Sequence, residues 1–323
     1  MVDSRNKSFN NKGVEATLID VLVRHGLKGQ ALTVAYSGGL DSTVLLCALQ
    51  KIVGFLDLQV SAIHVNHGLS KNADDWADHC VQICRRLHID LSVINVLVKP
   101  KLGEGIEAAA RNARLEALLA NSSGQICMAH HADDQAETVL HNLLRGSGLR
   151  GAGGIPMLRG RILRPFLDLP KKSLLSYAAE HQLEWVEDES NKDCHYTRNY
   201  LRHEVVPLLK LRFPKTVEQL SVAARRFSDA QTLLDDLALL DLKKDQFLFP
   251  IEVSLLRELT EVRARNLMRS LLSGNNVQLP DERRLNEFVR QVRTASNDRH
   301  PSIETPTYRL WVMASELHFL KKT

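Results

Sequence analysis

Residues 37–42 read Ser-Gly-Gly-Leu-Asp-Ser and bring two glycines, two hydroxyls and a carboxylate into one short segment. Gly38 and Gly39 lack a Cβ atom, so the main chain can take unusual angles and an anion can approach it closely. The apolar periodicity that begins at Leu40 predicts a helix, whose free N–H groups would point at the same spot. Together with the two serine hydroxyls, these features predict a phosphate-binding loop.

The carboxylate of Asp41 needs a separate explanation. A negative charge in the first helical turn suits the helix dipole, but it would repel a bound phosphate. A bridging Mg²⁺ removes this conflict, because the ion prefers one or two carboxylates together with phosphate oxygens. We therefore predict that Asp41 is a magnesium ligand. The segment is not a Walker A loop, since no lysine follows the glycines.

The segments around this loop predict the fold that positions it. The apolar, β-branched run 31–35 precedes the loop, so the loop lies at the carboxyl end of a strand. Strand-like and helical segments alternate from there to residue 129, which predicts an α/β fold with a parallel sheet flanked by helices. A further strand is predicted over 161–167.

The second half of the chain has a different pattern. From Pro214 it is rich in leucine and arginine at helical spacing, which predicts helices over 217–242, 253–272 and 282–292 and a strand or hairpin over 308–320. We expect a catalytic domain over residues 1–213 and a mostly helical domain over 214–323.

Ligands of parallel sheets bind at the carboxyl ends of the strands, so polar residues there are candidates for a site. The second predicted strand ends in a segment that contains His64 and Asn66. Loop hydrogen bonding is the ordinary interpretation of these two residues, and contact with an adenine edge is the functional one. The fourth predicted strand ends at His130 and His131.

Two carboxylates, Asp134 and Glu137, follow the fourth strand one helical turn apart on one face. The plain interpretation is a solvated acidic turn in which Asp133 caps the helix. The functional interpretation is a pair that holds an ammonium group and accepts its proton, as general base catalysis requires. The second interpretation implies an amine nucleophile.

Arg111 and Arg114 share one face of a predicted helix with Glu107. A surface ion pair with Glu107 would contribute only a few tenths of a kcal/mol, about 0.2–1. The intervening alanines suggest close packing instead, which would leave the arginines directed at an anion.

Residues 145–154 contain a G-x-G-x-x-G match that follows a helix rather than a strand, so it does not indicate a dinucleotide site. A mobile flap that carries Arg145 and Arg150 over the active site fits the pattern better. Further arginines in the second half could contact an RNA backbone as a group. They are Arg225, Arg226, Arg263, Arg265, Arg269, Arg283, Arg284, Arg290 and Arg293.

Composition limits the class of protein. The 323 residues are 25% charged and 44% hydrophobic with a net charge of +4, ordinary values for a globular protein. No apolar run approaches the roughly 20 residues that span a bilayer, and the N-terminus has no signal-peptide pattern, so we expect a soluble cytoplasmic protein without a membrane partner. The five cysteines argue against a disulfide framework and lack C-x-x-C spacing.

Four blocks of sequence carry a resemblance to a known family. Residues 37–42 resemble the PP-loop of the ATP pyrophosphatases, which cleave ATP between its α and β phosphates and adenylate a carbonyl oxygen. Residues 130–138, 145–148 and 187–202 make the chain similar to the tRNA(Ile)-lysidine synthases within that superfamily. Members often carry a further C-terminal domain, and we expect this chain to stop before one would fit, as a naturally short form or a truncated one.

The resemblance implies an ATP-dependent ligase that attaches free lysine to C2 of the wobble cytidine in an isoleucine tRNA with a CAU anticodon. It implies that Arg111 or Arg114 neutralises charge on the α-phosphate and that Asp134 and Glu137 position and deprotonate lysine. A homodimer is compatible with it. The implied contacts to ATP and Mg²⁺ are Ala35, Tyr36, Ser37, Gly38, Gly39, Leu40, Asp41, Ser42, His64, Asn66 and His130. The implied contacts to tRNA are Arg145, Arg150, Arg198, Arg202, Arg225 and Arg226.

Three alternatives stay open at this point. A tRNA thiolase of the same superfamily would need reactive or cluster-binding cysteines near the site. A serine hydrolase is suggested because residues 35–39 are one residue away from the nucleophile elbow around Ser37. A non-catalytic RNA-binding protein is the third alternative, although it would have no use for the phosphate loop.

Overall fold

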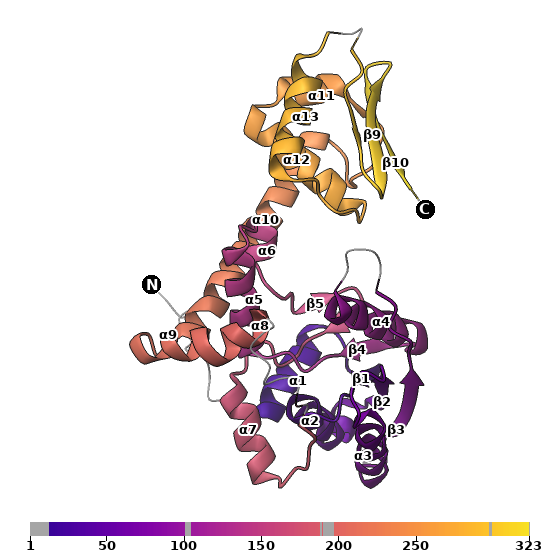
Figure 1. Cartoon of the computed structure of the whole chain (residues 1–323), viewed down its shortest axis with the longest axis vertical. Helices are drawn as coiled ribbons and strands as arrows, with labels where there is room; N and C mark the ends of the chain where they lie inside the picture. The colour runs from indigo at the N-terminus through magenta and orange to yellow at the C-terminus, as the bar shows by residue number, and fades with distance from the viewer. Residues whose placement is uncertain (1–12, 101–104, 188, 190–196, 297–298, 323) are drawn as a thin grey trace. The chain divides into compact units, whose positions relative to one another are not determined.

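The computed structural model describes residues 13–100, 105–187, 189, 197–296 and 299–322. The chain divides into two compact units, residues 1–226 and 227–323. Figure 1 colours the first unit from indigo to salmon and the second in orange and yellow.

Within the described residues, the first unit is built on a six-stranded sheet. Its strands are β1 (Ala31–Ala35), β2 (Gln59–Asn66), β3 (Asp90–Asn95), β4 (Gln125–Cys127), β5 (Leu158–Arg159) and β6 (Ile162–Leu163), in the order β3-β2-β1-β4-β6-β5. Every pairing is parallel except that of β5 with β6. The chain adds β2 and β3 on one side of β1 and then β4 on the other, so the strand order reverses there. In α/β sheets this switch point is where ligands bind.

Helices cover both faces of this sheet (Figure 1). One face carries α1 (Val14–Arg24), α2 (Leu40–Leu56), α3 (Ala73–Arg86) and α7 (Lys171–Glu180), and the other carries α4 (Ile106–Asn121). Ala62 belongs to the core under the first group, whereas Ile63 packs with Leu118 of α4. This division follows from the strand itself, because neighbouring side chains point to opposite faces.

A smaller helical layer follows β4. Its elements are α5 (Ala132–Leu144), α6 (Leu149–Ala152), α8 (Thr197–Tyr200), the π-helix η2 (Leu201–Val205) and α9 (Val206–Arg212). Ala132 and Ala136 of α5 pack in one apolar cluster with Val206. The π-helix lies between α8 and α9, and such segments occur frequently at functional sites.

The second unit combines helices with a small sheet. Its elements are the end of α10 (Thr216–Leu242), β7 (Ile251–Glu252), α11 (Val253–Glu258), α12 (Glu261–Gly274), α13 (Glu282–Thr294), β8 (Ser302–Glu304), β9 (Tyr308–Met313) and β10 (Glu316–Lys321). In the described part of the chain these strands form an antiparallel sheet in the order β7-β10-β9-β8. Leu267 and Leu271 of α12, Phe288 of α13 and Leu310 of β9 lie in its core.

The fold class and the final hairpin are as expected, and three details differ. The segment 253–272 is two helices rather than one, because Thr260 caps α12 by accepting a hydrogen bond from the backbone N–H of Arg263. The strand expected over 161–167 is limited to Ile162–Leu163. The second half also contains β7 and β8, which the helical pattern did not predict. The division at residue 226 lies within α10, and the boundary predicted at 213 lies just before it. No helix among the described residues could cross a membrane.

Arg161 generates a prediction about the stability of the first unit. Its guanidinium donates hydrogen bonds to the backbone carbonyls of Ser122 and Gly124, the latter at 2.8 and 3.1 Å, and so joins β6 to the turn before β4. We expect Arg161→Met to lower the free energy of unfolding by about 2–4 kcal/mol, because it leaves partly buried carbonyls without a donor. Urea titration measures this change. Arg159→Met, at an exposed position of β5, is the matched control, and equal midpoints for the two variants would contradict the role of Arg161.

Candidate active site

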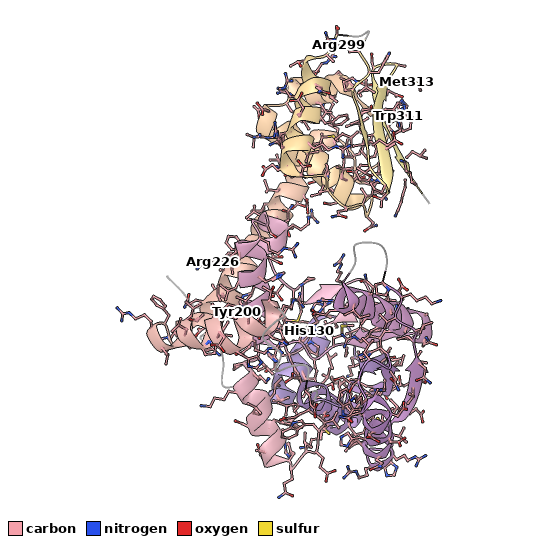
Figure 2. The ribbon with its side chains drawn as sticks, viewed as in Figure 1. His130, Tyr200, Arg226, Arg299, Trp311 and Met313 are labelled. Atoms are coloured by element: carbon pink, nitrogen blue, oxygen red, sulfur yellow. The ribbon has the colours of Figure 1, made fainter. Side chains whose placement is uncertain are left out.

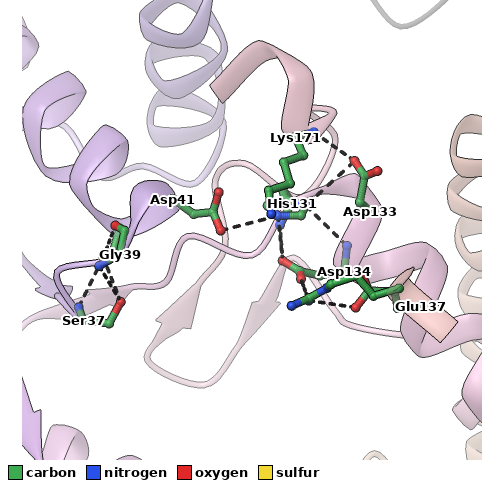
Figure 3. Close-up of polar contacts among 10 residues, drawn as sticks. Ser37, Gly39, Asp41, His131, Asp133, Asp134, Glu137 and Lys171 are labelled. Atoms are coloured by element: carbon green, nitrogen blue, oxygen red, sulfur yellow. Dashed lines mark hydrogen bonds and ion pairs between the residues drawn. The ribbon is translucent and has the colours of Figure 1, made fainter. Parts of the chain in front are cut away.

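The carboxyl ends of β1 and β4 meet at the switch point of the sheet, and two helices begin there. The loop 36–39 joins β1 to α2, and residues 128–131 join β4 to α5. Because β1 and β4 are parallel neighbours, both helix N-termini lie at the same edge. Figure 3 shows the side chains that meet there.

The loop after β1 has the geometry of an anion cradle. Gly38 has a φ of +81°, which favours glycine. Ser42 Oγ accepts hydrogen bonds from the backbone N–H of Ser37 at 3.2 Å and donates one to Gly39 O at 3.0 Å, so it fixes the turn. Gly39 is the N-cap of α2 and no side chain caps the helix. The N-terminal N–H groups of α2 therefore have no side-chain acceptor and are suited to a phosphate.

Asp41 lies in the first turn of α2 with one oxygen engaged and the other free. Its Oδ2 is 3.5 Å from Nε2 of His131. Its Oδ1 is buried and has no hydrogen-bond partner among the described residues. A buried carboxylate oxygen without a donor is costly, which makes it a suitable ligand for a cation.

His131 connects the two helix N-termini (Figure 3). It is buried, with 2% of its surface exposed, and it is the N-cap of α5. Its Nδ1 accepts a hydrogen bond from Asp134 N at 3.4 Å, so the neutral ring carries its proton on Nε2, which faces Asp41. Burial opposes the charged form, but contacts with Asp41, Asp134 and Asp133 outweigh it and raise the pKa of His131.

The expectation that Asp133 caps α5 is wrong, because His131 occupies the cap position. Asp133 instead forms hydrogen bonds to α7 and α9. Its Oδ2 accepts a hydrogen bond from the backbone N–H of Lys171 at the start of α7, and its Oδ1 pairs with Lys210 Nζ, both at 2.9 Å. Asp133 thus positions helices around the site.

Asp134 and Glu137 lie together on α5 as expected, and Arg202 of the π-helix bridges them. Arg202 donates to both oxygens of Glu137 at 2.8 Å and to Asp134 Oδ1 at 3.0 Å. Glu137 is 6% exposed, and burial raises its pKa although Arg202 acts in the opposite direction. The family resemblance assigns Arg202 to tRNA contact. In this structure its guanidinium is instead paired with the two carboxylates.

His130 lies at the end of β4 among positive charges (labelled in Figure 2). Burial lowers its pKa to about 4; Asp134 opposes this shift, and the charges of Arg164 and Arg111 add to it. Arg111 is therefore close enough to affect the charge of His130, and its contact with an α-phosphate stays a prediction. Both Arg111 and Arg114 have exposed side chains. The choice between them as the α-phosphate contact stays open.

The residues at the end of β2 support the fold of the site. His64 donates from Nδ1 to Tyr36 O at 3.0 Å, and burial lowers its pKa, which favours the neutral ring. Asn66 donates to Asp74 at 2.9 Å and accepts from the backbone N–H of Gly68 at 2.9 Å. Its side-chain amide is therefore engaged in the loop, and reading of an adenine edge by Asn66 stays a prediction.

The arginines expected to contact RNA differ in whether they form ion pairs with carboxylates of the protein. Several arginines of the second half have an acidic partner, in the pairs Arg225–Asp168, Arg263–Asp241, Arg265–Glu261, Arg269–Glu282 and Arg290–Glu287. Arg145, Arg150 and Arg226 have exposed side chains, and that of Arg198 is half-buried. Surface ion pairs contribute little and exchange readily for a phosphate.

Sequence reasoning missed two residues of this site. His131 was predicted only to lie at the strand tip, because His-x-x-Asp differs from the usual Ser/Thr-x-x-Glu/Gln signature, and the capping box is visible only in the structure. Arg164 was passed over because it lay inside an expected strand. Its burial among charged neighbours became visible only in the tertiary structure.

The geometry weighs against two of the alternatives. Cys80, Cys84 and Cys127 are buried, and burial raises the pKa of each thiol to about 12, which makes them inert. Cys194 lies outside the described residues. Ser37 Oγ donates to Ser42 Oγ at 3.0 Å, and among the described residues no histidine hydrogen-bonds to it. A nucleophilic serine needs such a base.

Comparison with known proteins defines the class first. The model of the PP-loop domain family matches residues 10–209, so the first unit is a PP-loop ATP-binding domain. The solved structure of the U34-tRNA thiolase NcsA from Methanococcus maripaludis has a similar fold, with a TM-score of 0.56 and 18% identity over 66% of this chain and 77% of that one. Within the second unit, the model of the TilS substrate binding domain matches residues 252–318.

Curated relatives then define the family. Proteins named tRNA(Ile)-lysidine synthase are 43% identical in Alkalilimnicola ehrlichii (89% of this chain, 66% of the relative) and 37% identical in Nitrosomonas europaea (90% and 66%). The protein of that name from Pseudomonas fluorescens is 39% identical over 88% of this chain and 68% of its own length. This chain belongs to the tRNA(Ile)-lysidine synthase family. It spans about two thirds of the length of these relatives.

Gly38 generates a prediction about the loop. A Cβ atom there would lie 2.9 Å from Cys80 Sγ and 3.1 Å from Val186 Cγ2, at a positive φ. We expect Gly38→Ala to destabilise the protein by about 1–3 kcal/mol and to weaken ATP binding, because the backbone must leave its cradle geometry. Thermal unfolding and calorimetric titration with ATP measure both effects. Gly54→Ala, in open space on α2, is the control, and unchanged ATP affinity in Gly38→Ala would exclude the cradle role.

Proposed function

We propose that this chain ligates lysine to C2 of the wobble cytidine, position 34, of an isoleucine tRNA with the anticodon CAU. The cytosine O2 attacks the α-phosphate of ATP and releases pyrophosphate, and a lysine amine then displaces AMP from the adenylated tRNA. The family and its substrate binding domain support the choice of substrate. The geometry supports the chemistry, because a phosphate loop and a pair of carboxylates meet at one edge of the sheet.

The loop 37–42 binds the phosphates of ATP in this proposal, and Asp41 holds Mg²⁺. The unpartnered, buried Oδ1 of Asp41 fits a cation ligand, and MgATP would complete its coordination with phosphate oxygens. When bound, the ion would neutralise charge on the phosphates. His131 keeps Oδ2 of Asp41 in place through its Nε2, so the carboxylate presents its other oxygen.

Asp134 and Glu137 bind the amine of lysine. Arg202 now fills this position with a cation, and a substrate ammonium would replace that charge. The raised pKa of Glu137 suits a group that accepts a proton from the ammonium once Arg202 has moved. Glu137 is therefore the general base of the second step.

The tRNA contacts arginines of the first unit whose side chains are exposed or half-buried. The backbone of RNA is recognised chiefly through its phosphates, which suits Arg145, Arg150, Arg198 and Arg226. A homodimer and a cytoplasmic location, as expected from the family resemblance, complete the proposal.

The single observation that carries the function is the contact of His131 with Asp41 and Asp134, which joins the nucleotide side to the amine side. The direct test incubates the protein with labelled lysine, ATP and total tRNA and analyses the nucleosides. We expect label in one modified cytidine and equimolar AMP and pyrophosphate. A thionucleoside, or label without ATP, would contradict the proposal.

Asp41 provides the first variant. We expect Asp41→Ala to reduce pyrophosphate release at least about 1000-fold while tRNA affinity changes less than twofold, because the electrostatic role of Asp41 is confined to MgATP. Pyrophosphate assays and filter binding give the two quantities. Asp75→Ala, an exposed carboxylate in the first turn of α3, is the matched control. Normal turnover in Asp41→Ala would remove its role in metal binding.

Glu137 provides the second variant. We expect Glu137→Gln to slow lysidine formation about 100-fold or more and to accumulate adenylated tRNA, because adenylation precedes the proton transfer from lysine. Gel analysis with α-labelled ATP detects the intermediate. Glu116→Gln, at an exposed position of α4, is the control. If Glu137→Gln instead stopped adenylation, the residue would belong to the first step.

A further inference from the structure

Arg164 is a buried cation that the proposed chemistry has not used. It follows directly after β6 and is 7% exposed. Its Nη1 donates to Pro156 O at 2.9 Å. Its Nε is buried and has no hydrogen-bond partner among the described residues.

The surroundings of Arg164 do not compensate its charge. Burial and, to a smaller extent, the positive charges of Arg111 and Arg159 together lower its pKa to about 10. No carboxylate pairs with Arg164 within the described residues, whereas Arg202 of the same unit pairs with two. A buried arginine without an anion is expensive, so its position suggests that an anion binds there.

His130 follows β4, the strand next to β6, and it too has a buried nitrogen without a hydrogen-bond partner among the described residues. β4 and β6 are parallel, with Cys127 opposite Leu163, and Met128 N donates to Leu163 O at 2.9 Å. The residues that follow these strands therefore emerge at one edge. The Nδ1 atom of His130 is buried and lacks a partner among the described residues. The low pKa keeps the ring neutral, so it can donate one hydrogen bond without adding charge.

We propose that Arg164 and His130 form a binding site for an oxyanion of a substrate at the end of β4 and β6. The guanidinium would offer Nε and the imidazole would offer a ring N–H, an arrangement that suits a carboxylate or a phosphoryl group. This inference rests on the proposed function, which supplies two such anions. They are the carboxylate of lysine and the α-phosphoryl group of the nucleotide.

The position of Arg164 in the sheet bears on which of the two anions it would bind. β6 is two strands from the phosphate loop, about 10 Å at the usual strand spacing. It adjoins β4, from which α5 carries Asp134 and Glu137. A lysine whose amine lies at these carboxylates would bring its own carboxylate toward Arg164. A nucleotide would have to extend its α-phosphoryl group away from the loop.

The kinetic test compares two quantities in Arg164→Lys, which keeps the charge and loses the planar fork. One is tRNA-dependent pyrophosphate release from ATP without lysine, and the other is the KM for lysine in the complete reaction. A carboxylate site predicts an increase in this KM of about 10- to 100-fold with normal pyrophosphate release. A phosphoryl site predicts a fall of pyrophosphate release by a similar factor. Both quantities within twofold of the wild type would overturn the inference.

A stability measurement separates binding from folding. Arg164→Met removes an uncompensated buried charge and also one hydrogen bond to Pro156 O, and because these effects oppose each other its melting temperature should change little. Arg161→Met, three residues earlier on the same segment, should melt lower because that guanidinium satisfies backbone carbonyls. A loss in Arg164→Met as large as that in Arg161→Met would assign Arg164 a structural role and overturn the inference.

His130→Gln tests the second residue of the site. It should alter the same kinetic quantity as Arg164→Lys, by about tenfold. If Arg164→Lys changed the KM for lysine and His130→Gln changed pyrophosphate release, or the reverse, the two residues would not share one site. Wild-type protein that forms no lysidine would contradict the proposed function as well, whereas an active wild type with unaffected variants would contradict only this inference.

Discussion

The contact between His131 and Asp41 is the constraint on which the site depends. His131 caps α5 through Nδ1 and faces Asp41 of α2 through Nε2, so one imidazole ring links the two helices that begin at the switch point of the sheet. The ring is buried, and its hydrogen bond to Asp134 N fixes the tautomer. A shift of either helix would break one of these contacts. The phosphate loop and the carboxylate pair are thereby held in a fixed relation.

The polar groups around this histidine fall into two kinds. Asp133 and Asn66 are satisfied by neighbouring backbone or side chains and maintain the fold. Asp41 Oδ1, His130 Nδ1 and Arg164 Nε are buried without partners in the described chain. Buried polar atoms are otherwise almost always paired. Other such atoms occur elsewhere in the described chain, but these three follow the neighbouring strands β1, β4 and β6, which is typical of a site that keeps bonding capacity for ligands.

Arg202 shows how a satisfied group can still serve the site. It pairs with both carboxylates of α5 from within a π-helix, a less stable backbone form than the α-helix on either side. This pairing avoids two close, uncompensated carboxylates. In the proposed function the lysine ammonium takes over this role, because the same electrostatic field attracts either cation.

The sequence by itself determined the elements and the chemistry of the loop. Alternating periodicity gave the parallel sheet, and the residues at 37–42 defined the phosphate cradle, because these signals are local. It also placed Asp134 and Glu137 on one helical face. Only the tertiary structure decided that His131 faces Asp41, that Arg202 bridges the carboxylates, and that Arg164 is buried without an anion. These contacts join residues from 65 to 90 positions apart or depend on burial, and neither property follows from local spacing.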